Sequence, residues 1–340
     1  AMSGAKVLML EAGRNYDPVT ETPMFQTNEQ APLRGGSTPA KPFGFYDATV
    51  DGGWQTPGEP YTQGSSKPEE QFWWWRARML GGRTNHWGRI SLRNGPYDFK
   101  PKDRDGLGFN WPIGYEDVAP YYDLVEMLIG VYGTNEGLEN TPSSPDGVLL
   151  PPPKARANEA LTWKHAKKLG IPIIPIHRAV LTKKLDSKRL SKKLHPDNPI
   201  AIQIIEQEMN RRLACFWATR CGRGCSILAN YQSTAVHIPP ALASGNLDII
   251  TNAMVHEVEI DACGKARGVK FIDKMSNLEY AVKARVVVLA ASSGESVRIM
   301  LNSKSAKFPN GIANGSGLVG KYLMDTVGSW LGGQIPALEN

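Results

Sequence analysis

Three cysteines lie close together in one glycine-containing stretch of the chain. They are Cys215, Cys221 and Cys225, in the pattern Cys-x5-Cys-x3-Cys. No histidine follows at zinc-finger spacing, so a closed zinc site is not expected. Two interpretations remain open: buried thiols or a disulfide in an oxidising compartment, or the ligands of an iron–sulfur cluster. Cys263 stands apart, in a predicted hairpin turn, and is expected to be a free thiol.

An acidic residue at the end of an apolar run is a second chemical signal. Residues 6–10 are predicted to form a buried parallel strand, and Glu11 follows them directly. In dinucleotide-binding folds an acidic residue at this place accepts hydrogen bonds from a ribose; the alternative is a solvent-exposed glutamate. The fingerprint G-x-G-x-x-G belongs about 20 residues upstream, where the sequence has too few residues. We therefore expect the first strand, the phosphate-binding loop and most of the first helix to be missing from this chain.

A glycine pair followed by polar side chains is the third signal, in the segment RMLGGRTNHWGRISLR. Gly81 and Gly82 allow positive φ angles and a close approach of the backbone to a ligand. Thr84, Asn85 and His86 follow within the same turn. A glycine pair alone is weak evidence of a ligand site, so its meaning depends on the motifs around it.

Helices are predicted on both sides of a proline-rich boundary. From Tyr115 onward the spacing predicts an amphipathic helix, which Pro120 interrupts. The residues 149–154 mark a loop that leads into a separate lobe. The apolar stripe of the helix is predicted to consist of Val118, Tyr121, Tyr122, Val125 and Leu128.

The last third of the chain is expected to consist mainly of strands. The segment from Leu242 to Asp273 is predicted to hold strands joined by a turn at Gly264. Residues 286–290 are predicted to form a buried parallel strand, followed by a tight turn at 292–294 and a helix that begins near Glu295.

In chain order, these motifs resemble the glucose–methanol–choline (GMC) family of FAD-dependent oxidoreductases. The resemblance implies an α/β fold, in which an incomplete FAD-binding Rossmann-like domain is interleaved with an α+β substrate or cap domain. The FAD-binding domain is expected at residues 1–100 and 210–330, truncated at both ends. Residues 101–209 are expected to be an inserted helical and loop region of the substrate or cap lobe.

The same resemblance implies contacts with FAD. The segment 317–326 resembles one that passes the flavin ring, although Thr326 stands where relatives often have a histidine. His86 matches a histidine that is covalently bonded to the flavin in pyranose oxidases; the alternative is a packed histidine. Arg93 matches an arginine that follows the glycine loop. The implied cofactor-binding positions are Glu11, Gly81, Gly82, Thr84, Asn85, His86, Val255, Ala291 and Ser292.

Within the family the chain looks most like bacterial sugar dehydrogenases. Their resemblance implies a 3Fe-4S cluster on Cys215, Cys221 and Cys225, which passes electrons to a cytochrome or a small subunit. The catalytic histidine pair, or histidine and asparagine, is expected beyond Asn340, so the catalytic residues are unknown and this chain alone is expected to be inactive. The expected function is oxidation of a sugar or glycoside hydroxyl without oxygen as acceptor; the alternative is a non-catalytic flavin-binding or electron-transfer piece.

The composition is that of an ordinary folded protein. Of the 340 residues, 41% are hydrophobic and 21% charged, which argues against disorder. The net charge of +6 is partly due to the lysine-rich residues 183–193. These are expected to form a solvated surface loop, and without interleaved aromatic residues no nucleic-acid partner is expected. No run of 18 apolar residues predicts a transmembrane segment, and periplasm and cytoplasm both remain open.

Overall fold

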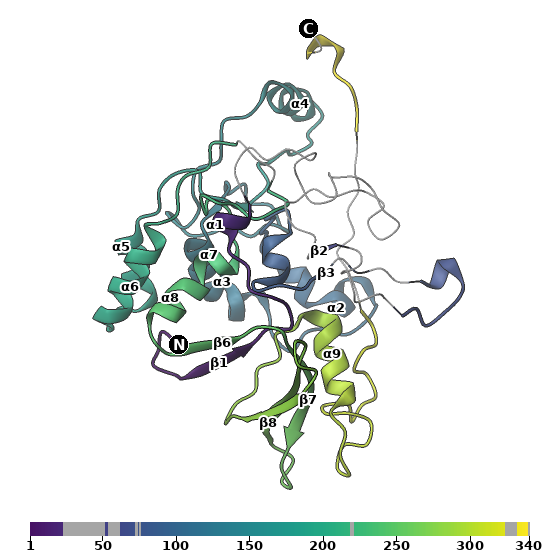
Figure 1. Cartoon of the computed structure of the whole chain (residues 1–340). Coiled ribbons are helices and arrows are strands. Elements are labelled where there is room, and N and C mark those ends of the chain that lie inside the picture. The colour runs from purple at the N-terminus through teal and green to yellow at the C-terminus, as the bar shows by residue number, and fades with distance from the viewer. Residues whose placement is uncertain are drawn as a thin grey trace. The chain divides into compact units, whose positions relative to one another are not determined.

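The structure, a computed structural model, is a mixed α/β fold in two compact units (Figure 1). It describes residues 1–22, 52–53, 62–71, 74, 76–217, 221–323 and 332–338. The first unit comprises Ala1–Val7, Tyr16–Leu247 and Ala337–Asn340, and the second comprises Leu8–Asn15 and Asp248–Pro336. Residues 101–209 belong to the first unit together with residues on both sides of them, and their assignment to a lobe of their own stays a prediction.

The first unit contains most of the helices. Its α-helices are α1 (Pro18–Glu21), α2 (Pro101–Asp105), α3 (Tyr115–Ile129), α4 (Ala157–Lys168), α5 (Ser187–Leu194), α6 (Pro199–Met209), α7 (Ser233–Val236) and α8 (Ile238–Ala243). Two antiparallel strand pairs accompany them, β2 (Gly52–Gly53) with β3 (Arg76–Ala77) and β4 (Val131–Tyr132) with β5 (Arg178–Ala179). The 3-10 turns of the described chain are η3 (Pro68–Glu70), η4 (Gly82–Asn85), η5 (Pro96–Phe99) and η6 (Pro336–Leu338).

Helix α3 begins at Tyr115 as predicted, but its buried face is not the predicted one. The Asp117 carboxylate accepts a hydrogen bond from Gly114 N at 2.8 Å and so caps the first turn. Pro120 lies inside a continuous helix rather than starting a second one. Tyr121 is 67% and Val125 is 47% exposed, so the predicted apolar stripe was wrong. The buried residues include Glu126, whose carboxylate is paired with a cation, which hydrophobic periodicity cannot detect.

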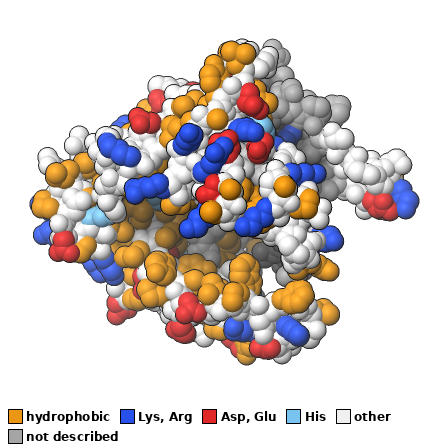
Figure 2. All heavy atoms as spheres, turned by 90° about the horizontal axis from the view of Figure 1, so that it is seen from below, with side chains coloured by type: hydrophobic (Ala, Val, Ile, Leu, Met, Phe, Trp, Pro, Cys, Tyr) orange, Lys and Arg blue, Asp and Glu red, His pale blue; other side chains and the backbone are white. Residues whose placement is uncertain are grey.

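The lysine-rich stretch forms helix α5, and not the surface loop that was predicted. Asp186 caps it by accepting a hydrogen bond from Arg189 N at 3.0 Å. Leu190 is buried in a core with Met127, Ile205 and Met209, and α5 packs on α6 (Figure 1). The lysines of α5 are exposed. On the face drawn in Figure 2, basic side chains are interspersed with acidic ones.

The second unit is built on strands. β1 (Val7–Leu10) pairs with β6 (Leu247–Ile250). The bonds Val7 N to Asn246 O and Glu11 N to Ile250 O keep one register along both strands, so the pair is parallel. Residues 7–10 are thus a parallel strand as predicted, although Val7 and Leu8 are exposed. β7 (Ala253–Ile260), β8 (Ala266–Asp273) and β9 (Glu279–Lys283) form an antiparallel sheet, and exposed Cys263 lies in the turn between β7 and β8.

Residues 286–290 are not the predicted buried strand. They belong to no strand of the described chain, and Val286 and Val288 are 75% and 79% exposed. Val287 and Leu289 pack against the core formed by β7, β8 and α9 (Ser292–Asn302). A continuous apolar run is typical of a strand that is covered on both faces. Within the described residues, only alternate side chains of this segment, Val287 and Leu289, pack against an apolar core. Helix α9 does follow, three residues earlier than predicted.

Among the described residues, no helix has the length and apolar character needed to cross a membrane.

Candidate functional site

The glycine loop has the backbone geometry that its sequence predicts. Gly81 and Gly82 have φ angles of 90° and 49°. A side chain at Gly81 would place its Cβ 2.8 Å from Asn85 Nδ2, whereas no atom of the described residues lies within 4 Å of a Cβ built on Gly82. Gly81 is therefore required for packing, and the backbone at Gly82 is open to the approach of a flat ligand.

Side chains of the same loop fasten it to the N-terminus of α7. The Thr84 hydroxyl donates to Gly81 O at 2.5 Å and accepts a hydrogen bond from Ser233 N at 3.0 Å. Asn85 is fully buried and donates to Leu80 O at 2.9 Å. His86 is also buried. The loop is thus a fixed turn; a packed His86 stays the favoured prediction, with covalent attachment to a flavin as the alternative.

Behind this loop lies Arg89, which is completely buried. Its guanidinium donates to Trp87 O at 2.5 Å and Thr84 O at 3.2 Å within the loop segment, to Tyr231 O at 3.2 Å, and to Cys221 O. Burial lowers the pKa of Arg89 to about 10, which still leaves it protonated at neutral pH. Arg89 is a site residue that the sequence interpretation missed, because GRISLR looks like an ordinary polar surface segment.

The three cysteines are free thiols in the described structure, and the metal site predicted on them stays a prediction. No group of three or more metal-ligating side chains suitable for a metal ion occurs in the described part of the chain. Burial raises the pKa of the Cys215 thiol, although a hydrogen bond from Trp217 N opposes this. Residues 218–220 of this loop, Arg220 included, lie outside the described chain.

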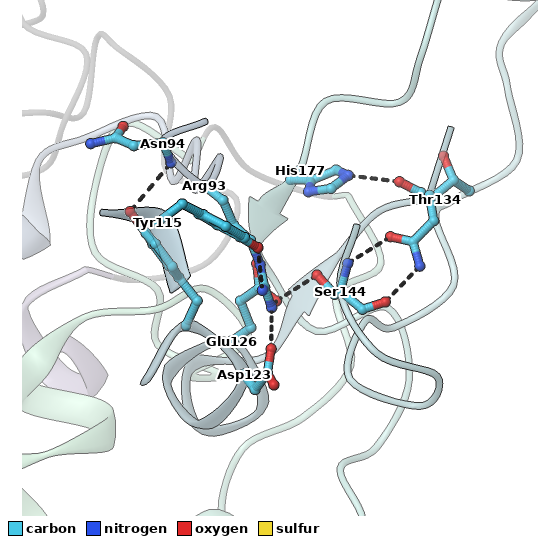
Figure 3. Close-up of polar contacts among 10 residues, drawn as sticks. Arg93, Asn94, Tyr115, Asp123, Glu126, Thr134, Ser144 and His177 are labelled. Carbon is cyan, nitrogen blue, oxygen red and sulfur yellow. Dashed lines mark hydrogen bonds and ion pairs between the residues drawn. The ribbon is translucent and has the colours of Figure 1, made fainter. Parts of the chain in front are cut away.

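A buried network of charges holds the segment after the glycine loop against α3 (Figure 3). Arg93 binds Glu126 in a bidentate manner, with Nε to Oε1 at 3.0 Å and Nη2 to Oε2 at 2.5 Å, and it also contacts Asp123 at 2.7 Å. Ser144 donates to Glu126 at 2.7 Å. Burial alone would lower the pKa of Arg93, but the hydrogen bonds from its guanidinium to Glu126, Tyr115 and Asp123 outweigh it and raise this pKa. Arg93 is thus occupied in structural ion pairs.

In the second unit, four of the predicted positions lie at the end of β1, on β7 and at the start of α9. Glu11 follows β1, and its Oε1 accepts a hydrogen bond from Gly13 N at 2.7 Å, which orients the carboxylate at the strand end. The carbonyl of Val255 on β7 accepts a hydrogen bond from Arg298 of α9 at 2.9 Å. Ala291 is the N-cap of α9, and Ser292 has a positive φ of 69°.

Comparison with known proteins decides the family. Residues 201–327 match the family described as GMC oxidoreductase. The chain is 28% identical over 274 residues to paromamine 6'-oxidase of Streptomyces fradiae, which covers 79% of this chain and 44% of that protein. The chain belongs to the GMC oxidoreductase family.

The chain is also similar to a dehydrogenase subunit and to a solved structure. The chain is 29% identical over 252 residues to the fructose dehydrogenase large subunit of Gluconobacter japonicus, covering 73% of this chain and 41% of that protein. An FAD-dependent oxidoreductase structure from Chaetomium thermophilum aligns with a TM-score of 0.44 at 14% identity, covering 88% of this chain and 43% of that one. The chain therefore spans less than half the length of these relatives.

The predicted FAD-contacting positions of this GMC chain divide between the two units. Gly81, Gly82, Thr84, Asn85 and His86 lie together in the first unit, and Glu11, Val255, Ala291 and Ser292 lie in the second. Their convergence on one cofactor stays a prediction. Residues 324–326 of the segment predicted to pass the flavin lie outside the described chain.

The backbone at Gly82 in the first unit and the Glu11 carboxylate in the second each fit a part of a flavin dinucleotide. The open backbone at Gly82 suits a ring system, since no neighbour would be displaced by a ligand there. The oriented carboxylate of Glu11 suits a ribose, because it is an acceptor at the end of a parallel strand.

Proposed function

We propose that the protein to which this chain belongs oxidises an alcohol group of a small molecule, with a sugar or glycoside hydroxyl as the substrate class. The observation that carries this proposal is the GMC match at residues 201–327. It is supported by similarity to proteins named for paromamine and fructose, both of which carry several hydroxyl groups. The active site would take a polar, uncharged CH–OH group as hydride donor.

When bound, FAD supplies the acceptor for the hydride that leaves the alcohol carbon. The contribution of this chain is to hold and orient that cofactor. The Glu11 carboxylate would accept hydrogen bonds from the adenosine ribose, and the Val255 backbone would meet the adenine. The fixed turn from Gly81 to His86 would lie against the flavin ring, with the open side of Gly82 toward it. Residues of the whole protein outside this chain would remove the hydroxyl proton.

We further propose that the electrons leave to an acceptor other than oxygen. The similarity to a dehydrogenase large subunit supports this choice, although an oxidase is among the relatives of comparable identity. A cluster on Cys215, Cys221 and Cys225 is one form that the electron route would take. We assign no step to it, because the described residues assemble no metal-binding group.

The experiment uses the full-length parent protein purified with its cofactor. FAD is identified after denaturation, and turnover is followed with an artificial electron acceptor and, separately, by oxygen consumption. A panel of sugars, glycosides and simple alkanols serves as substrates. We expect bound FAD, reduction of the dye with a sugar or glycoside, and little oxygen uptake. A parent that binds FAD but oxidises no alcohol would support the non-catalytic alternative, and a parent without FAD would refute the proposal.

A further inference from the structure

Two arginines of the first unit are buried without a carboxylate partner in the part of the chain that the structure describes. Arg89 is 0% and Arg212 is 1% exposed. Buried charges are usually paired with an opposite charge, because removal from water is costly. Both guanidinium groups instead bind oxygen atoms of backbone carbonyls and amides. Two buried cations without a described carboxylate partner therefore indicate that each guanidinium has a structural or functional role.

The two arginines differ in what they hold. Arg212 donates to the carbonyls of Leu228, Leu128 and Ile129, and so fastens α3 to the segment before α7. The partners of Arg89 instead belong to three separate segments. They are Thr84, Asn85 and Trp87 of the glycine loop, Cys221 of the cysteine loop, and Asn230 and Tyr231 just before α7.

The backbone at Arg89 is also unusual. Its φ is 59°, a conformation that side-chain-bearing residues rarely adopt. Ala179 N donates to its carbonyl at 2.8 Å, which ties β5 to the same point. The neighbouring structure therefore holds Arg89 in a strained conformation, in which its guanidinium reaches both loops.

We propose that Arg89 is a positioning residue that joins the Gly81–His86 loop to the cysteine loop and places a permanent positive charge behind the face predicted to receive the flavin. The proposal rests on the proposed function, in which that loop lies against the ring. A buried cation acts in a medium of low dielectric constant, so its field is felt more strongly than that of a surface charge. A positive charge close to the ring raises the flavin midpoint potential, because it favours the uptake of electrons.

Two variants separate the mechanical part of this role from the electrostatic part. Arg89→Lys keeps the charge but loses the planar fork that reaches several carbonyls. Asn230→Asp keeps the fork and adds a carboxylate 3.4 Å from Nη2, at the place of the Asn230 amide oxygen, which neutralises the field. Arg212→Lys is the matched control, since it alters an equally buried arginine whose hydrogen bonds go to Leu228, Leu128 and Ile129, outside both loops.

The measurements are the flavin midpoint potential of the full-length holoenzyme and the rate at which iodoacetamide alkylates Cys221, read by mass spectrometry. Alkylation requires no bound flavin. We expect Arg89→Lys to speed alkylation of Cys221 about tenfold, the size expected for losing a hydrogen bond to a charged group, with the potential near that of the parent. Asn230→Asp should lower the midpoint potential; because it also removes the hydrogen bond that Asn230 Nδ2 donates to Arg223 O, its alkylation rate is not used to judge the joining role. Arg212→Lys should change neither quantity.

The proposal is overturned if Asn230→Asp leaves the potential at the parent value, or if Arg212→Lys reproduces the effects of Arg89→Lys. If Arg89→Lys does not fold, Asn230→Asp still decides the electrostatic part, because it removes no contact of Arg89. A parent that binds no FAD would refute the proposed function instead, and the alkylation rates of Cys221 would then decide the joining role alone.

Discussion

At the scale of single residues, the buried ion pair of Arg93 and Glu126 should dominate local stability. Removing one partner of a buried pair leaves the other charge uncompensated and costs about 3–5 kcal/mol. We therefore expect Arg93→Met to lower the free energy of unfolding by about that amount, measured by urea denaturation. Arg104→Met is the control, because its pair with Asp105 is exposed and such pairs contribute about 0–1 kcal/mol. Equal losses from both variants would contradict the buried network.

A second residue-scale prediction concerns the Cys215 thiol. Burial raises its pKa above the ordinary 9.0, so the folded chain keeps this proton at a pH where the unfolded chain has released it. The resulting contribution to stability is fully present below about pH 9 and is lost as pH rises through the folded pKa. We expect alkylation of Cys215 to be slow at neutral pH and to rise above pH 9 in a mass-spectrometric pH series. Cys263, which is exposed, is the internal comparison. Rapid labelling of Cys215 at pH 7 would show a thiolate there and would favour a metal-ligand role.

At the scale of elements, alanine at Gly81, the N-cap of η4, and alanine at Gly82, its first residue, should lower the free energy of unfolding by different amounts. Both have positive φ, and alanine there costs about 1–2 kcal/mol. At Gly81 the added Cβ also meets Asn85 and Thr234, at 2.8 and 3.0 Å, whereas at Gly82 it meets open space. Gly81→Ala should lose about 1–3 kcal/mol more than Gly82→Ala, because overpacking adds that much.

For FAD affinity we expect the opposite order from stability, with the larger loss in Gly82→Ala. Gly82→Ala should weaken FAD binding by the full-length protein even though it disturbs the fold less, because its methyl group projects into the space predicted for the ring. Thermal denaturation of the apo-protein and titration with FAD measure the two effects separately. Parent-like FAD affinity in Gly82→Ala would place the flavin elsewhere.

At the scale of the whole molecule, the electron route depends on whether the cysteine loop holds iron. The cluster prediction expects iron and acid-labile sulfide in the full-length parent purified without oxygen, with a paramagnetic signal that Cys221→Ser abolishes. Flavin reduction by the substrate should survive this substitution, while electron delivery to a cytochrome slows. Cys263→Ser is the matched control, since that thiol lies in an exposed turn. An iron-free parent that reduces its cytochrome at full rate would make the three cysteines structural thiols.

The order of motifs along the chain determined the family and several local structures. Glycine at 81 and 82 fixed a turn with positive φ, the start of α3 followed from its spacing and cap, and Cys263 lies in the predicted hairpin turn. These features depend on neighbours in the sequence, so short-range chemistry is enough to specify them. The site positions that rest on the resemblance remain predictions, since no ligand contact tests them.

Only the tertiary structure decided which charges and apolar side chains are buried. Arg89 and Arg212 look like solvated arginines in the sequence, and Val286 and Val288 look like core residues, yet the reverse holds for each of them. A buried arginine is stable because carbonyl groups from distant segments converge on it, and an apolar residue is buried only when another element covers it. Arg89 and Tyr231, for example, are 142 positions apart in the sequence, and no local pattern records their contact.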